Sequence, residues 1–382
     1  MSCMHPILII GAGPAGTMAA LRLAGTGMPV TLIEQHLFPR DKVCGECLSS
    51  LAIDVLRRAG ISAGSFSVTP TQFTRTRIVA QDGSEASFPL NLPMWGLSRR
   101  NLDTFLQQAA VEAGAKLLSP ARVEQIHPGD SPSGVVRNLS TNEVSTINGS
   151  TILLADGRGA FLQHRPKPTG DLGIKSHFSD IDADRHAIAL FSVAGAYVGV
   201  APIENNRWNI ACNVPVSIVR AHAGNSDAIL QTFRQQNAGL DRALRHASRE
   251  EPWLVSPLPR FAVQSRWLDN VIPLGNAAAA LEPIGGEGMG LALRSAELAA
   301  EEIIKAHAAN RSVNTRRLRA QYQSLWRTRR LACRATAVVL SSARYSSSLI
   351  ELARITPAIG RSVMRLMGKP CAKSCETSLS VV

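Results

Sequence analysis

The residues with the clearest chemical signature are three glycines near the N-terminus. Gly11, Gly13 and Gly16 form a Gly-x-Gly-x-x-Gly pattern that follows four consecutive apolar residues. This pattern is typical of the turn between a strand and a helix that binds a dinucleotide pyrophosphate. Gly11 permits the tight turn, Gly13 lets the backbone approach the phosphates, and Gly16 lets helix and strand pack closely. The phosphates then lie at the helix N-terminus, where free N–H groups favour an anion, beside Pro14 and Ala15.

Glu34 indicates which dinucleotide this pattern binds. It ends a second apolar strand, about 20 residues beyond the glycines, where an acidic side chain accepts hydrogen bonds from ribose hydroxyls. Because a carboxylate repels a 2′-phosphate, NADP is disfavoured at this position. FAD and NAD remain as candidates.

Two later stretches carry similar signals. Asp156-Gly157 follows an apolar strand in the middle of the chain, and Gly275-Asn276 follows another. A glycine-rich turn from Pro283 to Gly290 then leads into an Ala-rich helical stretch. Such a turn offers backbone N–H groups and a helix N-terminus to an anionic or electron-rich group. With the first pattern, it predicts one long ligand bound by both ends of the chain.

Taken in order, these motifs resemble those of the FAD-dependent oxidoreductases of the glutathione-reductase-like class. The resemblance is strongest to the geranylgeranyl-reductase and aromatic-hydroxylase (flavin monooxygenase) group, and it covers about residues 5–305. Its carriers are Gly11 to Gly16 with Glu34, Cys44-Gly45-Glu46, Arg99-x-x-Leu102-Asp103, Asp156-Gly157 and Gly275 to Gly290. The resemblance implies FAD as the cofactor and NAD(P)H as a transient co-substrate.

The resemblance also implies a role for each matched residue. The glycine pattern and Glu34 would hold the adenosine diphosphate half of FAD, and Arg99 would approach the diphosphate near the flavin. Asn276, after Gly275, would meet the ribityl chain, and Asp156-Gly157 would support the cofactor and the arriving NAD(P)H. The residues expected against the isoalloxazine ring come from the last turn and include Pro283, Gly286, Gly288 and Met289.

Three departures from the family pattern affect these expectations. Asn276 stands where the family usually has Asp, and an amide oxygen can still accept from a ribityl hydroxyl. Arg158-Gly159-Ala160 replaces a stretch that more often contains Ser. The sequence has no second Gly-x-Gly-x-x-Gly unit, so NAD(P)H should have no nucleotide-binding domain of its own.

The candidate reactive residues are Cys44 and Glu287. Cys44 matches a family cysteine near the flavin, whereas Cys47 is expected to pack where the loop joins the following helix. The two also form a Cys-x-x-Cys pair, which could be a redox dithiol or half of a zinc site, but we predict no metal. Glu287 lies between glycines beside the expected flavin, and its alternative role is that of a helix N-terminal acid. A structural or solvated role is expected for the other polar candidates, which are Lys175, His177, His186 and Arg207.

The order of elements predicts an α/β fold. A Rossmann-type FAD-binding domain would comprise residues 1–70, 96–165 and 265–310 and would have three layers, two of β-sheet and one of helices. A mostly antiparallel β-sheet domain for the substrate would comprise residues 71–95 and 166–264, where strand patterns dominate. Residues 311–382 would form a basic helical C-terminal region.

Composition limits where the protein works. No apolar run is long enough to span a membrane, and the N-terminal apolar stretch lacks the basic residues of a signal peptide. Seven cysteines in 382 residues suit a reducing compartment. We therefore expect a cytoplasmic protein that can associate peripherally with the inner face of a membrane.

The net charge of +12 is concentrated near the C-terminus. Between Lys305 and Lys373 there are 15 Lys or Arg residues and one acid, Glu351. This excess would suit an anionic lipid surface or the solvated face of a helical cap. Nucleic-acid binding is not expected, because no recognised module is present. A cap with weak membrane contact is favoured.

The function expected is that of an FAD-dependent oxidoreductase. The first reading is an NAD(P)H-driven monooxygenase that hydroxylates a hydrophobic aromatic or polyketide-like substrate. The alternative is a geranylgeranyl-reductase-like enzyme that saturates double bonds of an isoprenoid lipid. A third possibility, from a different class, is a flavin-binding protein without turnover.

Overall fold

The computed structural model describes residues 5–157, 159–162, 170–259 and 261–368. A parallel sheet lies at its centre, and its strands are β1 (Ile7–Ile10), β2 (Val30–Ile33), β6 (Lys116–Leu118), β10 (Thr151–Leu154) and β17 (Val271–Pro273). Their spatial order is β17-β10-β1-β2-β6, and every pairing is parallel. Both faces of β1, β2 and β10 are buried, which explains why these strands are continuous apolar runs.

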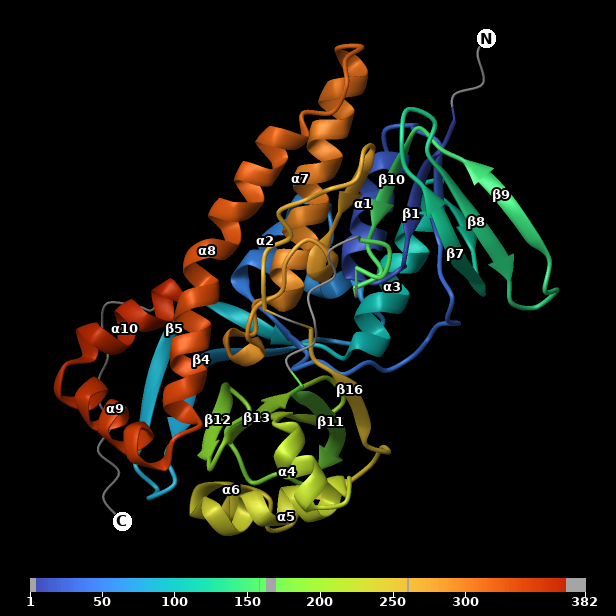
Figure 1. Cartoon of the computed structure of the whole chain (residues 1–382). Helices are drawn as coiled ribbons and strands as arrows, with labels where there is room; N and C mark the ends of the chain where they lie inside the picture. The colour runs from blue at the N-terminus through green and yellow to red at the C-terminus, as the bar shows by residue number, and fades with distance from the viewer. Residues whose placement is uncertain (1–4, 158, 163–169, 260, 369–382) are drawn as a thin grey trace.

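The central sheet is covered by helices on one face and by a small sheet on the other (Figure 1). The helices are α1 (Pro14–Ala24), α3 (Arg99–Glu112) and α7 (Gly288–Ala308), and the small antiparallel sheet contains β7 (Ala121–His127), β8 (Ser133–Asn138) and β9 (Val144–Asn148). Ile7 and Ile9 belong to the core under the helices, whereas Leu8 and Ile10 pack with Val123. This alternation is the period of a strand. The predicted three-layer ββα arrangement is confirmed.

A second, larger sheet lies next to the central sheet and its covering layers (Figure 1). Its strands are β3 (Cys47–Leu48), β4 (Thr71–Val79), β5 (Glu85–Gly96), β11 (Leu172–Ser179), β12 (Ala187–Val193), β13 (Ala196–Pro202), β14 (Trp208–Val214), β15 (Ser248–Arg249) and β16 (Leu254–Pro257). The pairings are antiparallel except β12 with β4. Strand β3 lies within the predicted 1–70 segment, so this segment also contributes to the second sheet. The predicted domain boundaries stay a prediction.

Short helices complete the second sheet. They are α4 (Val216–Ala221), α5 (Ser226–Gln236) and α6 (Ala238–Ala243), and they pack with β11–β14 in a separate hydrophobic core. Helices α5 and α6 meet at Asn237. The Asn237 side chain caps α6 by accepting from Leu240 N and donates to Ser192 O. Its amide is therefore better satisfied as a cap than inside one long helix.

As far as residue 368, the C-terminal region is helical, as expected, and it packs on α7 and on the second sheet; residues 369–382 of the predicted region lie outside the described residues. It contains α8 (Thr315–Leu340), α9 (Ala343–Ile355) and α10 (Pro357–Leu366). Tyr322 and Trp326 of α8 are fully buried, and Tyr322 donates to Ser295 O of α7 at 2.8 Å. The remaining elements are α2 (Ser50–Arg58) and the 3₁₀ turns at Ala63–Ser65, Gly275–Ala277 and Pro283–Gly285. In the part of the chain described here, no helix combines the length and apolar character that a membrane crossing requires.

Candidate functional site

The glycine turn joins β1 to α1. Gly11 has φ +101°, and a Cβ there would lie 2.6 Å from Ala155 O. A Cβ at Gly16 would lie 1.9 Å from Gly11 O. Both glycines are therefore required by the chain's own packing. A Cβ at Gly13, by contrast, would meet nothing nearer than Arg99 Nη2 at 3.9 Å.

The open side of Gly13 is also the N-terminus of α1. Gly13 is the N-cap residue, no side chain caps the helix, and its first turn contains no acid. The terminal N–H groups of α1 thus have no capping side chain and no acid in their own turn, which fits an anionic pyrophosphate. Pro14 and Ala15, also predicted as contacts, are buried in the first turn.

Glu34 lies beside this turn at the end of β2. Its carboxylate accepts hydrogen bonds from Ala12 N and His36 N, each at 2.8 Å. An ionised carboxylate has about four acceptor positions, so capacity remains for ribose hydroxyls. The ribose contact stays a prediction, and the structure adds a role that the sequence did not indicate, because Glu34 fixes the glycine turn.

The three predicted motifs converge. A Cβ at Gly275 would lie 3.2 Å from Ala15 Cβ, and a Cβ at Gly11 would lie 3.2 Å from Asp156 Cα. Asp156 accepts from Gly159 N and Ala160 N, so its carboxylate shapes its own turn beside Gly157. The fold therefore brings together residues from both ends of the chain, as one long ligand requires.

The turn after Gly275 presents a mixed surface. Asn276, Pro283 and Gly288 are exposed, and a Cβ at Gly288 would meet no atom within 4 Å. Gly286 is half-buried in the left-handed conformation, with φ +63°, and Met289 is buried in the first turn of α7. The exposed residues are accessible to a flavin, whereas the buried Met289 packs in the core beneath the turn.

Arg99 begins α3 and lies next to the glycine turn. Its guanidinium pairs with Asp103, and the Cys44 side chain lies close enough to affect its pKa. Burial alone would lower the pKa of Arg99, but the charge and hydrogen bonds of Asp103 raise it. Arg99 therefore remains a cation beside Gly13, where the diphosphate of FAD is expected.

The two candidate reactive residues have different surroundings. The Cys44 thiol is half-buried and accepts a hydrogen bond from Glu46 N at 3.4 Å, whereas Cys47 is buried and donates to Gly45 O. Glu287 is the fully buried N-cap residue of α7, and Arg329 Nε of α8 lies 3.8 Å from its carboxylate. The structural role of Glu287 thus has a partner in α8, and the catalytic roles of both residues stay predictions.

The family model for the FAD binding domain matches residues 4–314 of the chain. The chain belongs to this family of FAD-binding proteins. The open glycine turn, the cationic Arg99 and the accessible N-terminus of α1 fit the cofactor that the family binds. This flavoprotein is an FAD-dependent oxidoreductase, as its sequence motifs predict.

Related proteins match most of the length of this flavoprotein. It is 26% identical to menaquinone reductase of Mycolicibacterium smegmatis, with 96% of this chain and 89% of the relative covered. It is 25% identical to digeranylgeranylglycerophospholipid reductase 2 of Methanopyrus kandleri, with coverages of 84% and 81%. Among solved structures, the flavin-dependent brominase Bmp2 matches with a TM-score of 0.80 at 17% identity, over 96% of this chain and 94% of the brominase. This last likeness shows the fold.

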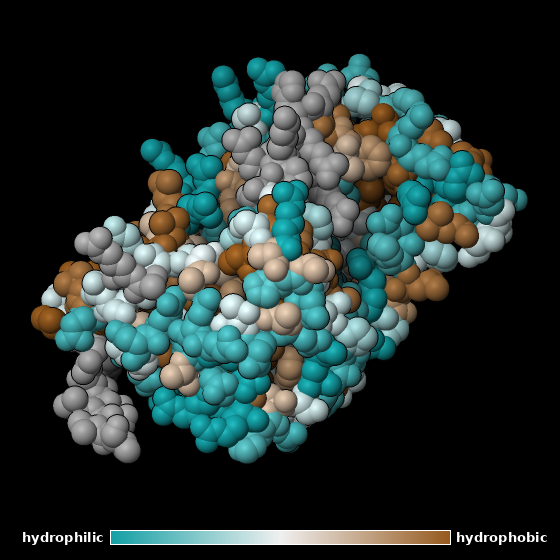
Figure 2. All heavy atoms as spheres, turned by 60° about the horizontal axis from the view of Figure 1, so that its bottom comes forward, coloured by the Kyte–Doolittle hydropathy of each residue, from teal (hydrophilic) through white to brown (hydrophobic). Residues whose placement is uncertain are grey.

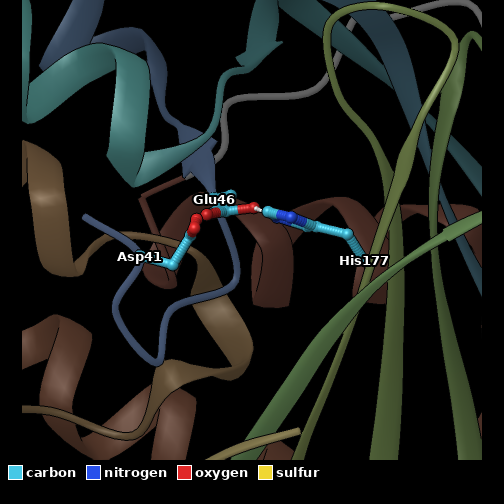
Figure 3. Close-up of side chains that lie close together, drawn as sticks. All are labelled: Asp41, Glu46 and His177. Carbon is cyan, nitrogen blue, oxygen red and sulfur yellow. Dashed lines mark hydrogen bonds and ion pairs between the residues drawn. The ribbon is translucent and has the colours of Figure 1, made fainter. Parts of the chain in front are cut away.

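A buried polar cluster next to Cys44 was not predicted. Glu46 lies between Asp41 and His177 (Figure 3), and its carboxylate bonds His177 Nε2 at 2.6 Å and Lys175 Nζ at 2.7 Å. The expectation of a solvated Lys175 was wrong, because its side chain is 1% exposed. His186 is exposed, and Arg207 pairs with Glu204.

The cluster contains groups that metal ions often bind. One ligand atom each from Asp41, Glu46 and His177 lies within 4.8 Å of the others. However, Lys175 Nζ also lies 3.6 Å from Asp41 Oδ1, so an ammonium group already supplies positive charge to both carboxylates. We therefore propose no metal at this position.

Proposed function

We propose that this flavoprotein uses NAD(P)H to reduce carbon–carbon double bonds in a hydrophobic isoprenoid-type substrate. The observation that carries the proposal is the near full-length similarity to menaquinone reductase, supported by the archaeal lipid reductase. The sequence motifs are common to both reaction types, and a monooxygenase was favoured from the sequence only because hydroxylases are the broader membership of the class. The relatives shift our preference to the reductase.

The residues of this chain would bind and orient the reactants, while bound FAD supplies hydride transfer. The N-terminus of α1 and Arg99 would hold the diphosphate, and the exposed residues Asn276, Pro283 and Gly288 would lie along the flavin. The second sheet would form the wall of the substrate site. NAD(P)H would bind transiently, because the chain carries a single glycine pattern of the dinucleotide type.

An oxygen-dependent reaction is the second candidate. It is kept because the sequence motifs are shared by both reaction types. Hydroxylation of an aromatic or polyketide-like substrate would use the same cofactor site.

One experiment distinguishes the two reactions. The FAD-loaded protein is reduced anaerobically with NADH or NADPH in the presence of a menaquinone or a polyprenyl lipid, and the products are weighed by mass spectrometry. A product that retains two added hydrogen atoms after air has re-oxidised any quinol, and that contains no added oxygen, supports the reductase. A product that forms only after oxygen is admitted, and gains one oxygen atom, supports the monooxygenase. Absence of substrate-dependent NAD(P)H consumption in both arms would contradict both.

We also propose that the C-terminal helices contact an anionic membrane surface, from which a lipid substrate would enter. Seven large apolar side chains of these helices are exposed: Leu331, Val338, Tyr345, Leu352, Ile355, Ile359 and Leu366. Figure 2 shows apolar surface at the left edge of the molecule, where Figure 1 places α9 and α10. Exposed arginines, including Arg316, Arg317 and Arg327, accompany them on α8. Apolar side chains together with basic ones are typical of interfacial helices.

A further inference from the structure

Glu46 has an unusual backbone conformation. Its φ is +54°, in the left-handed region that residues other than glycine rarely adopt. Its side chain is completely buried. Such a conformation persists only where the surrounding contacts determine it, and it is often associated with a functional site.

The contacts that determine it come from two layers of the fold. Carboxylate Oε1 accepts from the backbone N–H of Arg99, at the start of α3, and from Lys175 Nζ of β11. Carboxylate Oε2 bonds His177 Nε2, also of β11. One side chain therefore ties the helical layer of the FAD-binding sheet to the second sheet.

The backbone of Glu46 is equally occupied. Its N–H donates to Cys44 Sγ at 3.4 Å, and its carbonyl accepts from Leu97 N at 3.1 Å. The Cys44 carbonyl accepts from Asn209 Nδ2 of β14 at 3.0 Å. Cys44 is thus held at its thiol by Glu46 and at its carbonyl by the second sheet, with Arg99 beside the thiol.

The charge of the cluster follows from these contacts. Burial alone would raise the pKa of Glu46, but the hydrogen bond from His177 and the charge of Lys175 lower it. The carboxylate is therefore ionised at neutral pH. Arg99, Lys175 and His177 face it from α3 and β11, and Asp41 lies beyond Lys175.

We propose that Glu46 is a positioning residue of the flavin site, which fixes the Cys44 thiol beside Arg99 and sets the charge that this thiol experiences. The proposal deepens the proposed function and depends on it only for the role of Cys44 in turnover. The placement and charge of the thiol can be measured without turnover.

The two buried partners make opposite predictions for Cys44. Glu46→Gln removes a negative charge near the thiol while Arg99 remains, so more thiolate forms and alkylation at neutral pH accelerates. We expect an increase of about tenfold in the alkylation rate. Lys175→Met removes a neighbouring positive charge and keeps the carboxylate, so alkylation slows. Simple loosening of the structure would accelerate alkylation in both variants.

The experiment uses FAD-loaded protein in which the three cysteines outside the described residues, Cys3, Cys371 and Cys375, are replaced by Ser. The rate of iodoacetamide labelling is followed by mass spectrometry of the Cys44 peptide. The matched control is Glu297→Gln, because Glu297 is also fully buried but pairs with Arg58 and Arg294. Glu46→Asp, which keeps the charge, should restore most of the slow labelling.

Opposite shifts for Glu46→Gln and Lys175→Met, with a parental rate for Glu297→Gln, support the proposal. Equal shifts in all three variants, or no shift in Glu46→Gln, overturn it. If Glu46→Gln does not fold, the sign of the shift in Lys175→Met decides. Turnover is measured separately: a parent protein that labels as expected but never consumes NAD(P)H contradicts the proposed function and leaves the role of Glu46 in place.

Discussion

At the scale of single residues, Gly13 provides the most direct test of the cofactor site. Gly13→Val should abolish FAD binding, because its side chain would enter the open volume expected for the pyrophosphate. The fold should survive, since no protein atom lies close to that Cβ. Absorbance of bound flavin and thermal melting measure the two effects. Gly64→Val, at a surface turn, is the control; a Gly13→Val protein that keeps FAD would contradict the assignment.

Glu46 predicts how stability depends on pH. Its pKa is lowered in the folded protein, so the folded state binds this proton less readily than the unfolded chain does. The stabilisation is fully present above the ordinary carboxyl pKa and is lost as the pH falls through the folded pKa. Denaturant titrations below about pH 5 should therefore show a shallower loss of stability in Glu46→Gln than in the parent.

A matched comparison for this pH effect is Glu124→Gln. Glu124 pairs with Arg137 on the surface, where ion pairs contribute little. The stability of Glu124→Gln should fall at low pH as steeply as that of the parent protein. If the stability of Glu46→Gln and that of the parent fall equally at low pH, the contacts of the buried carboxylate with His177 and Lys175 do not stabilise the folded protein.

Residues close in sequence were easier to predict than residues brought together by the sheets. The pattern from Gly11 to Gly16 is local, so its turn, helix and ligand class follow from spacing alone. Glu46 and His177 are separated by 131 positions, and their contact depends on how β11 lies against the start of α3. No sequence periodicity encodes that relation, so Lys175 and His177 were interpreted as ordinary surface or structural residues.

At the scale of elements, α8 is part of the core. Trp326→Ala should lower the free energy of unfolding by about 3–5 kcal/mol, the usual cost of deleting a buried aromatic side chain. Tyr322→Phe should lower it by only about 0.5–1.5 kcal/mol, because one buried hydrogen bond is lost. Chemical denaturation measures both values. Leu331→Ala, on the exposed side of the same helix, should hardly change the free energy of unfolding. Equal changes for Trp326→Ala and Leu331→Ala would show that α8 is not part of the core.

Helix α8 also shows why its arginines were only partly understood from sequence. Arg334 donates to the buried Glu282, and Arg329 lies near Glu287 on the same glycine-rich turn. The basic residues of 311–382 predicted a helix with a charged face. The acids that pair with two of them, Glu282 and Glu287, lie earlier in the chain, in the glycine-rich turn before α7. Part of the positive charge therefore stabilises the expected flavin turn.

At the scale of the whole molecule, the proposed membrane contact is tested with vesicles. Arg316, Arg317 and Arg327 are exposed, and each basic residue near an anionic surface contributes about 1 kcal/mol. Replacing all three with Gln should weaken cosedimentation with anionic vesicles. Salt should weaken binding of the parent as well, because it screens the attraction.

The control for vesicle binding removes the same charge elsewhere. Arg220, Arg242 and Arg245 are exposed on and beside α4–α6, far from the apolar side chains of the C-terminal helices in sequence. Their replacement by Gln should leave binding unchanged. If the parent protein does not bind anionic vesicles even at low salt, the membrane proposal is wrong and the basic surface is only solvated.

The order of strands in the central sheet has a consequence for biosynthesis. Strands β1 and β2 are synthesised well before β10 and β17, which complete their sheet. The contact between Gly275 and Ala15 also joins the two ends of this span. Such long-range parallel pairing is slow to form, so the nascent chain carries an incomplete sheet through most of its translation. Cofactor loading must then follow synthesis of the helix-α7 segment, and FAD, by binding only the completed fold, would drive the last step of assembly.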